Sequence, residues 1–134
     1  MIISSKGTYA IRAIVDMAIN DGEDNYICLS SISNRLNVSR KYLESIMTLL
    51  AKNNLVDVTL GKCGGYKLNR KLEDYSLYDI LVVTEEEMKT TSCNCINQDG
   101  ICNQKNSCSV INTYNELHDL IINYLKNKTI KDLL

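Results

Sequence analysis

The feature that most limits how this chain can fold is a polar, cysteine-rich segment at residues 91–108. Four of the six cysteines of the chain fall within sixteen residues there, namely Cys93, Cys95, Cys102 and Cys108. The segment has almost nothing apolar to bury, so packing alone supplies little free energy to order its backbone. Bound metal is another source of that free energy, because thiolates are the soft ligands of iron–sulfur clusters and zinc. We therefore interpret the segment as the sensing part of the molecule.

Length and composition indicate one globular domain. The 134 residues are enough for a proper core, and 45% of them are hydrophobic. The apolar runs are too short to cross a bilayer, and the N-terminus lacks the basic and apolar regions of a signal peptide. We therefore expect a cytoplasmic protein, whose thiols stay reduced. Six cysteines in that compartment indicate metal or redox chemistry more than a disulfide framework.

Charge is divided unevenly along the chain. Residues 1–71 contain ten Lys or Arg against six Asp or Glu, whereas residues 72–134 contain five against ten. The two parts therefore carry +4 and −5, which sum to the net charge of −1. A basic first part and an acidic second part fit a nucleic-acid-binding domain joined to a different functional region. Chance asymmetry is the alternative.

The spacing of apolar residues predicts three helices in the basic part. The first covers residues 5–20, with Ser4 or Ser5 as its N-cap. Two shorter helices follow, capped by Ser30 and Ser39 and ending near residues 36 and 52. Two short helices joined by a brief turn, the second polar and basic at its start, are typical of a helix-turn-helix. Two packed helices without that function give the same pattern.

The last of these three helices carries the side chains that we expect to meet DNA. A helix fits the major groove, and its first residues reach the base edges. The candidates are Ser39, Arg40, Lys41, Tyr42 and Glu44. Because Glu44 repels phosphate, it either accepts a hydrogen bond from a cytosine amino group or pairs with Arg40 or Lys41 along the helix.

A hairpin follows directly and is interpreted as a wing. Residues 55–60 alternate as a strand, residues 61–65 form a glycine-rich turn, and residues 66–69 form the returning strand. The glycines permit positive φ and let the backbone come close to a phosphate. The wing therefore adds four predicted DNA-binding residues, which are Lys62, Gly64, Gly65 and Tyr66.

Two further helices are predicted on either side of the cysteine segment, at residues 76–88 and from Ser109 to about Asn127. The second has two apolar stripes one residue apart, which are Val110, Tyr114, Leu117, Ile121 and Tyr124, and Ile111, His118, Ile122 and Leu125. A face this wide indicates a partner helix, most simply that of a second copy in a homodimer. Packing on its own domain is the alternative.

These elements define a mainly α fold class, a winged helix-turn-helix with a long C-terminal dimerisation helix. We expect residues 1–75 to form the DNA-binding domain. Residues 76–134 are then the cysteine-rich sensor loop and the dimerisation helix. The chain contains no catalytic constellation of nucleophile, base and acid, so we do not expect an enzyme.

Five pieces in this order resemble the IscR/NsrR-type winged-helix regulators, namely residues 5–13, 39–46, 55–56, 61–68 and 128–133. The resemblance covers nearly the whole chain. It implies a dimeric bacterial transcription factor, usually a repressor, that binds a double-stranded DNA operator. It also implies an iron–sulfur cluster, [2Fe–2S] or [4Fe–4S], on three cysteines placed before the long helix. Cys102 and Cys108 match two of those places.

The chain departs from the pattern of these regulators at several positions. It offers both Cys93 and Cys95 where the family has one cysteine. Ile111 stands where [2Fe–2S] members have a histidine, and Thr8 stands where [4Fe–4S] members can take a carboxylate. The fourth ligand is thus open, and the two early cysteines together would complete an all-cysteine site. In the wing, Leu60 stands where the family often uses an arginine to enter the minor groove.

Two other interpretations of the cysteines stay open. In the first, the DNA-binding fold is kept, and Cys93 or Cys95 and Cys102 or Cys108 form disulfides on oxidation as a thiol switch. In the second, the four cysteines hold a structural zinc ion in a protein-interaction module. The segment lacks the paired Cys-x-x-Cys spacing that zinc sites usually have, which favours the other interpretations.

The remaining cysteines, the histidine and an acidic run are predicted mainly to have structural roles. Cys28 lies between two apolar residues and is predicted in the core. Cys63 is either an inert surface thiol or a second redox handle in the wing. His118 is predicted to be an interface residue rather than a ligand, and the run at residues 85–87 is predicted to be a solvated helix end.

Overall fold

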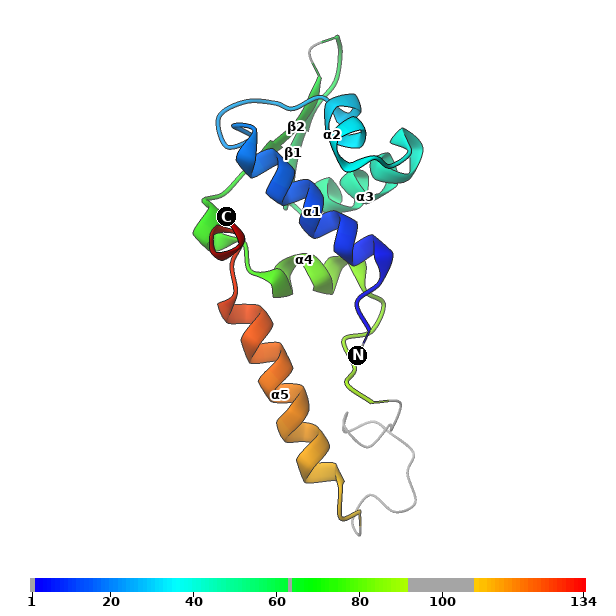
Figure 1. Cartoon of the computed structure of the whole chain (residues 1–134), viewed down its shortest axis with the longest axis vertical. Helices are drawn as coiled ribbons and strands as arrows, with labels where there is room; N and C mark the ends of the chain where they lie inside the picture. Colours follow the sequence, from blue (N-terminus) through cyan, green and yellow to red (C-terminus); the bar gives the residue numbers. More distant parts are fainter. Residues whose placement is uncertain (1, 63, 92–107) are drawn as a thin grey trace.

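The computed structural model describes residues 2–62, 64–91 and 108–134. Its elements are α1 (Ser5–Ile19), α2 (Leu29–Leu36), α3 (Arg40–Lys52), β1 (Val56–Thr59), β2 (Gly65–Leu68), the 3-10 helix η1 (Leu72–Asp74), α4 (Leu77–Thr84), α5 (Ile111–Asn127) and the 3-10 helix η2 (Lys131–Leu133). Figure 1 shows the wing and the first three helices at one end, α4 below them, and α5 extending away. The predicted mainly α, winged helix-turn-helix fold is confirmed. No helix in these described ranges is long and apolar enough to span a membrane.

The core lies where α1, α2, α3, α4 and the hairpin meet. The side chains it buries on the helices recur every three or four residues, as the 3.6-residue helical period requires. The largest group comes from α1 and α3, namely Ala10, Ala13, Ile14, Met17, Leu43, Ile46, Met47 and Leu50. On α3 the buried stripe of Leu43, Ile46, Met47 and Leu50 follows this helical spacing, and the opposite side of α3 is left to solvent.

Serine caps begin α1 and α3 as predicted. The hydroxyl of Ser4 accepts a hydrogen bond from the Gly7 N–H at 3.1 Å, and that of Ser39 accepts one from the Tyr42 N–H at 3.2 Å. Each hydroxyl satisfies a backbone donor that has no partner within its helix. Asn37, which adopts a left-handed conformation with φ of 54°, ends α2 and makes the turn to α3.

The predictions for the start of α2 and for Cys28 are wrong. The helix begins at Leu29, and no side chain, that of Ser30 included, caps it. The chain is fixed instead by Ile27 and Tyr66, which exchange two backbone hydrogen bonds of 2.8 and 2.9 Å. Successive side chains of an extended segment point to opposite sides. Ile27 takes the inward position and packs against the core, so Cys28 is exposed.

The C-terminal tail returns to the middle of the molecule. The Leu77 N–H donates to the Lys128 carbonyl, and the Ile130 N–H donates to the Tyr75 carbonyl, each at 2.9 Å. Ile130 is fully buried in the core. These contacts fix the end of α5 beside the start of α4. The predicted fourth helix was too long at its other end, since α4 stops at Thr84.

Candidate nucleic-acid interface and sensor segment

The polar side of α3 is exposed, and it lies at the same end of the molecule as the wing, where Figure 1 places both elements. Ser39 stands at its N-cap, and Arg40, Lys41, Tyr42 and Glu44 are exposed on its first turns. The opposite side of the helix is buried in the core, so the protomer itself does not cover this surface. A helix presented in this way can enter the major groove with its N-terminal residues toward the bases.

An ion pair holds α2, the first helix of the helix-turn-helix, against α1. The Nε and Nη2 groups of Arg35 donate to the two carboxylate oxygens of Asp16 at 2.8 and 2.7 Å. The Asp16 side chain is almost wholly buried. Hydrogen bonding to Asp16 raises the pKa of the Arg35 guanidinium above its ordinary value. The bidentate geometry fixes orientation as well as distance, and the periodicity that locates each helix gives no signal of a pair between two helices.

Tyr42 joins α3 to α1 while a third of its surface stays exposed. Its ring meets the ring of Tyr9 edge-on, with centroids 6.0 Å apart. The guanidinium carbon of Arg12 lies 5.0 Å from the Tyr9 centroid on the same helix. Edge-to-face aromatic contacts and cation–π contacts favour these arrangements. Tyr42 is therefore held against α1 while part of its surface stays open to solvent.

A surface groove separates α3 from the wing. It brings together six of the predicted DNA-binding residues, which are Arg40, Glu44, Lys62, Gly64, Gly65 and Tyr66. The other three, Ser39, Lys41 and Tyr42, lie on α3 or at its cap outside the lining. No ion pair of Glu44 is found in the described part of the chain, so the intrahelical pairing considered for it is not seen there.

Two of the predicted DNA-binding residues of the wing also have structural roles. A Cβ atom on Gly65 would collide with the backbone of Ile27, so Gly65 is needed for the close approach of the wing to the start of α2. The positive φ predicted for the glycines of this turn is found at Gly61, with φ of 112°. The Tyr66 side chain is buried in the core instead of standing on the exposed surface. It supports the wing from within.

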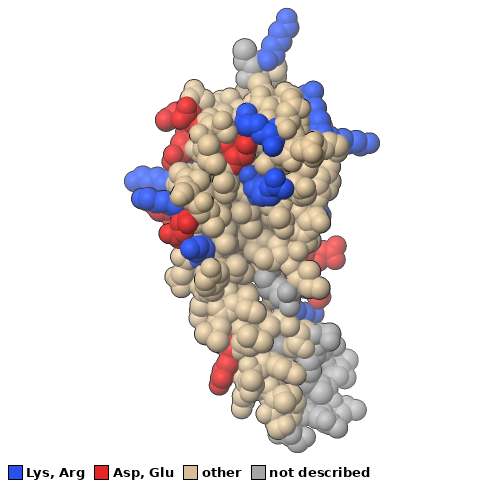
Figure 2. Space-filling view, in the orientation of Figure 1, with Lys and Arg blue, Asp and Glu red and all other residues tan. Residues whose placement is uncertain are grey.

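The charged side chains are gathered at the same end of the molecule. Figure 2 shows Lys and Arg over the end that holds the helix-turn-helix and at the tip of the wing, with acidic side chains among them. The face shown over α5 carries few charges. Basic side chains near a groove raise the local attraction for a polyanion. On the face shown, the charged side chains thus lie mostly over the helix-turn-helix end, and few lie over the long helix.

Most of the predicted metal ligands lie outside the described residues. These are Cys93, Cys95 and Cys102, and Cys63 of the wing also lies outside. Cys108 is half-buried with a free thiol, three residues before α5 begins at Ile111. Within the described ranges, no three His, Cys, Asp or Glu side chains are grouped so that they could hold a metal ion. The chemistry of the predicted donor set, all thiols, suits an iron–sulfur cluster.

The stretch of chain that leads from α4 into the cysteine segment is tied to two other helices. The Thr90 hydroxyl lies 2.9 Å from Nδ1 of His118 on α5. The Glu85 carboxylate accepts hydrogen bonds from the backbone N–H and the hydroxyl of Ser4 at the start of α1. Glu85 is half-buried, so the prediction that residues 85–87 form a solvated helix end is wrong at this position.

The two apolar stripes of α5, which begins two residues later than predicted, have different surroundings. The stripe of Ile111, His118, Ile122 and Leu125 is half-buried or buried by the protein's own chain, where α5 packs on α4. The other stripe is largely uncovered. Its Leu117 is 46% exposed and its Tyr124 63%, and Leu120 beside them is more exposed still. Packing on its own domain therefore accounts for only one of the stripes.

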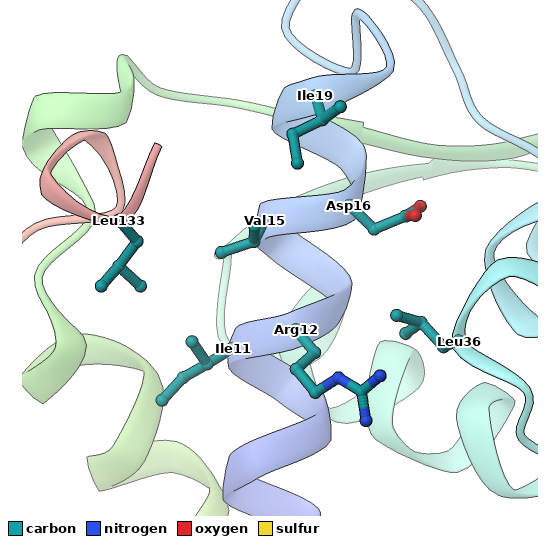
Figure 3. Close-up of a pocket in the computed structure, with 7 residues that line it drawn as sticks. All are labelled: Ile11, Arg12, Val15, Asp16, Ile19, Leu36 and Leu133. Carbon is teal, nitrogen blue, oxygen red and sulfur yellow. The ribbon is translucent and has the colours of Figure 1, made fainter.

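A second hollow, lined mainly by apolar side chains, lies beside α1, and Figure 3 shows the residues that line it. They are Ile11, Arg12, Val15, Asp16, Ile19, Leu36 and Leu133. Ile11 and Val15 lie on the side of α1 toward Leu133, which comes from the C-terminal tail (Figure 3). Sequence reasoning missed the hollow because its lining combines both ends of the chain. It leaves α1, like α5, with an uncovered apolar side.

Comparison with known proteins gives a consistent set of relatives. The model of the Rrf2 family, described as iron-dependent transcriptional regulator, matches residues 3–134. The HTH-type transcriptional regulator IscR of Escherichia coli O1:K1 is 31% identical over 134 residues, which are 100% of this chain and 80% of that protein.

Solved structures have the same fold. CymR, the global cysteine regulator of B. subtilis, superposes with a TM-score of 0.79 at 23% identity, over 99% of this chain and 95% of that one. IscR of T. potens gives a TM-score of 0.74 at 27% identity, over 99% and 85% of the two chains. The oxidised form of Staphylococcus aureus CymR gives 0.71 at 27% identity, over 99% and 95%.

Proposed function

Because this chain belongs to the Rrf2 family of transcriptional regulators, we propose that it is a dimeric repressor that senses its signal through the cysteines at residues 93–108. The chain is a DNA-binding transcriptional regulator related to IscR and CymR and is not an enzyme. The signal is iron–sulfur status, redox state or nitric oxide. The observation that carries the DNA-binding part is the groove between α3 and the wing.

In this proposal the groove receives one phosphate backbone of the operator. Arg40 lies on the helix side of the groove and Lys62 on the wing side, and the backbones of Gly64 and Gly65 allow close approach. The start of α3 then enters the major groove, where Ser39, Arg40, Lys41 and Tyr42 contact phosphates or bases. Glu44 accepts a hydrogen bond from a cytosine amino group, a pairing that suits a carboxylate with no ion pair to any described residue.

Homodimerisation is proposed through the uncovered stripe of α5. Val110, Tyr114, Leu117 and Tyr124 leave a continuous apolar side that the protomer does not bury. Two copies meeting along this stripe would bury it reciprocally around a two-fold axis. A dimer presents two copies of α3, whose separation has to match the spacing of two operator half-sites.

The sensor proposal assigns an iron–sulfur cluster to Cys102, Cys108 and one or both of Cys93 and Cys95. A bound cluster supplies a centre that responds to oxidants and to nitric oxide. The protein's own contribution is mechanical, because the chain leading into the segment is tied to α1 through Glu85 and to α5 through the Thr90–His118 contact. Ordering or releasing the segment would shift these helices and with them the spacing of the two α3 helices. A coupling of about 1–3 kcal/mol would change operator affinity roughly 5- to 150-fold.

A cluster-free thiol switch is the second candidate. One specific observation favours it, which is that a relative of the same fold, CymR of S. aureus, has been crystallised in an oxidised form. In this version, oxidation joins Cys93 or Cys95 to Cys102 or Cys108 as disulfides, and reduction restores the thiols. The same connections to α1 and α5 would carry the change to α3.

Anaerobic purification, an ultraviolet–visible spectrum and counts of iron, sulfide and zinc per chain separate these candidates. A brown protein with iron and sulfide supports the cluster. A colourless, iron-free protein that changes mobility on oxidation supports the thiol switch, and one zinc per chain without DNA binding would point to an interaction module. Operator fragments selected from random duplexes are then titrated with loaded and unloaded protein. Equal affinity of the two forms for every selected fragment would refute the switching mechanism.

A further inference from the structure

The exposed side of α3 has a different neighbour on each of its two flanks. On one flank, Arg40 and Glu44 line the groove that faces the wing. On the other flank, the ring of Tyr42 meets the ring of Tyr9 on α1. The strip of helix surface between the two flanks lies opposite the buried stripe of α3. When α3 docks on DNA, this strip is the part that reaches deepest into the major groove.

Three side chains form a row along this strip, namely Lys41, Ser45 and Thr48. They are four and three residues apart, so they lie on one side of the helix. All three are exposed. The charge of Lys41 attracts phosphates and acceptor groups of bases, and it places that residue among the predicted DNA-binding residues. The other two members of the row carry no charge, so any contact that they make depends on hydrogen bonds or on apolar surface.

Ser45 and Thr48 offer different groups to a base edge. The hydroxyl of Ser45 donates to the Tyr42 carbonyl at 2.6 Å, so its proton is already used within the helix. Ser45 is therefore left with an acceptor oxygen. Thr48 differs from a serine by a methyl group on the same carbon as its hydroxyl, and this is the only methyl group in the row. The row thus presents one small apolar group at Thr48.

We propose that Thr48 is a specificity-determining residue whose methyl group contacts the C5-methyl group of a thymine in the operator. This role rests on the proposed DNA-binding function and deepens it. Among the four bases, thymine alone presents a methyl group in the major groove, and the methyl group of a threonine can pack against it. The contact removes apolar surface of both partners from water. It therefore favours thymine over the other three bases at that position.

The place of this thymine follows from the geometry of α3. Thr48 lies four residues beyond Glu44, which is about 6 Å along the helix axis. Successive base pairs of DNA are about 3.4 Å apart. If Glu44 accepts from a cytosine amino group, the thymine is expected within about two base pairs of that cytosine, toward the C-terminal end of α3. Each half-site is therefore expected to carry the two bases at a fixed separation.

The test removes the methyl group from the protein and from the DNA separately. Thr48→Ser loses the methyl group and keeps the hydroxyl, whereas Thr48→Val keeps a methyl group and loses the hydroxyl. Uracil, which lacks only the C5-methyl group, replaces thymine at one position at a time in both half-sites of the best duplex that the wild type selects. Fluorescence anisotropy measures each affinity. The three residue types are similar in helix propensity, and circular dichroism checks that α3 is kept.

The wild type is expected to bind about fourfold more weakly per half-site when uracil stands at the contacted position, a factor that corresponds to roughly 0.8 kcal/mol for one buried methyl group. Thr48→Ser is expected to bind the thymine duplex more weakly by a similar factor and to bind the uracil duplex equally well. Thr48→Val is expected to distinguish the two duplexes as the wild type does. Ser45→Ala, in the same row, is the matched control and is expected to keep this discrimination.

Three results would overturn the role of Thr48 while DNA binding stands. The first is a wild type that loses no affinity at any uracil position. The second is a Thr48→Ser variant that still distinguishes thymine from uracil, and the third is a Thr48→Val variant that no longer does. If the wild type selects no duplex at all, the proposed DNA contact and this inference both fail. Loss of the discrimination in Thr48→Ser, with its retention in Thr48→Val and Ser45→Ala, supports the inference.

Discussion

The carboxylate of Glu85 holds the first turn of α1 through Ser4. It accepts hydrogen bonds from the Ser4 hydroxyl at 2.7 Å and from the Ser4 backbone N–H at 3.2 Å, across a separation of 81 residues. The same hydroxyl accepts from the Gly7 N–H and so caps the helix. Glu85 is also the C-cap residue of α4, where the chain leaves toward the cysteines. A change in that segment therefore has a direct route to α1.

Replacing Glu85 by alanine is expected to lower the free energy of unfolding by about 1–2 kcal/mol, because hydrogen bonds to a charged group and the favourable position at a helix N-terminus are lost together. Urea unfolding followed by circular dichroism measures the change. Glu86→Ala is the matched control, since Glu86 is exposed and adjacent in the sequence. Equal midpoints for the two variants would contradict the role assigned to Glu85.

The Asp16–Arg35 pair leads to a second prediction about stability. Asp16→Asn leaves Arg35 beside a neutral amide that cannot accept the same bidentate pair, and it is expected to destabilise the protein by about 1–3 kcal/mol. Arg35 is partly exposed and regains water when the pair is lost, which keeps the effect below that of a fully buried pair. Asp24→Asn, at an exposed position, is the control for the removal of one negative charge. Thermal melts of the two variants that coincide would speak against the pair.

Tyr75 gives the fold a dependence on alkaline pH. Its phenol donates to the Leu55 carbonyl at 2.7 Å and accepts from the Asn69 N–H at 3.0 Å. Burial raises the pKa of Tyr75 above its ordinary value of 10.0. Above pH 10 the unfolded chain therefore loses this proton while the folded chain keeps it. Since the folded state then binds more protons, stability falls as pH rises from 10 toward the folded pKa.

Tyr75→Phe tests this assignment. At neutral pH the variant is expected to be less stable by about 1–2 kcal/mol, because the buried Leu55 carbonyl and the part-buried Asn69 N–H lose a partner. Above pH 10 the wild type alone carries the additional loss, so the gap between the two proteins should narrow. Urea unfolding between pH 8 and about pH 11.5 measures the gap, with Tyr26→Phe at an exposed position as the control. A gap that stays constant would argue against a raised pKa for Tyr75.

The sequence predicts those structural features that depend on residues only a few positions apart. The hydroxyls of Ser4 and Ser39 cap helices three residues away, and the inward stripe of α3 follows from helical spacing. The exposure of Arg40 and Lys41 follows from the same spacing, because an amphipathic helix has to leave its polar side to solvent. These relationships need no knowledge of how the helices pack.

Features set by packing between distant segments were missed or wrong. Cys28 has apolar neighbours, yet the bridge between Ile27 and Tyr66 turns it outward. Glu85 resembles a solvated helix end until α1 is packed beside it. The groove between α3 and the wing also depends on this packing, because Gly65 brings the hairpin against Ile27. Periodicity along one element holds no information about which element lies opposite.

The uncovered stripe of α5 leads to a prediction about assembly. Leu117→Asp places a charge at an exposed apolar position that the monomer does not need for its own packing. The variant is therefore expected to keep its helical content and to lose the dimer, because burying an unpaired carboxylate at the contact is costly. Asn123→Asp adds the same charge at an exposed polar position on the other side of the helix and is expected to leave assembly unchanged.

Analytical ultracentrifugation of the three proteins over a range of concentrations measures this effect, and circular dichroism checks the fold. If Leu117→Asp sediments as the wild type does, the stripe is not the contact between copies. If Leu117→Asp alone becomes monomeric, its affinity for a two-half-site operator should fall much further than its affinity for a single half-site. The reason is that the α3 helices of two protomers bind the two half-sites together only while α5 joins the protomers.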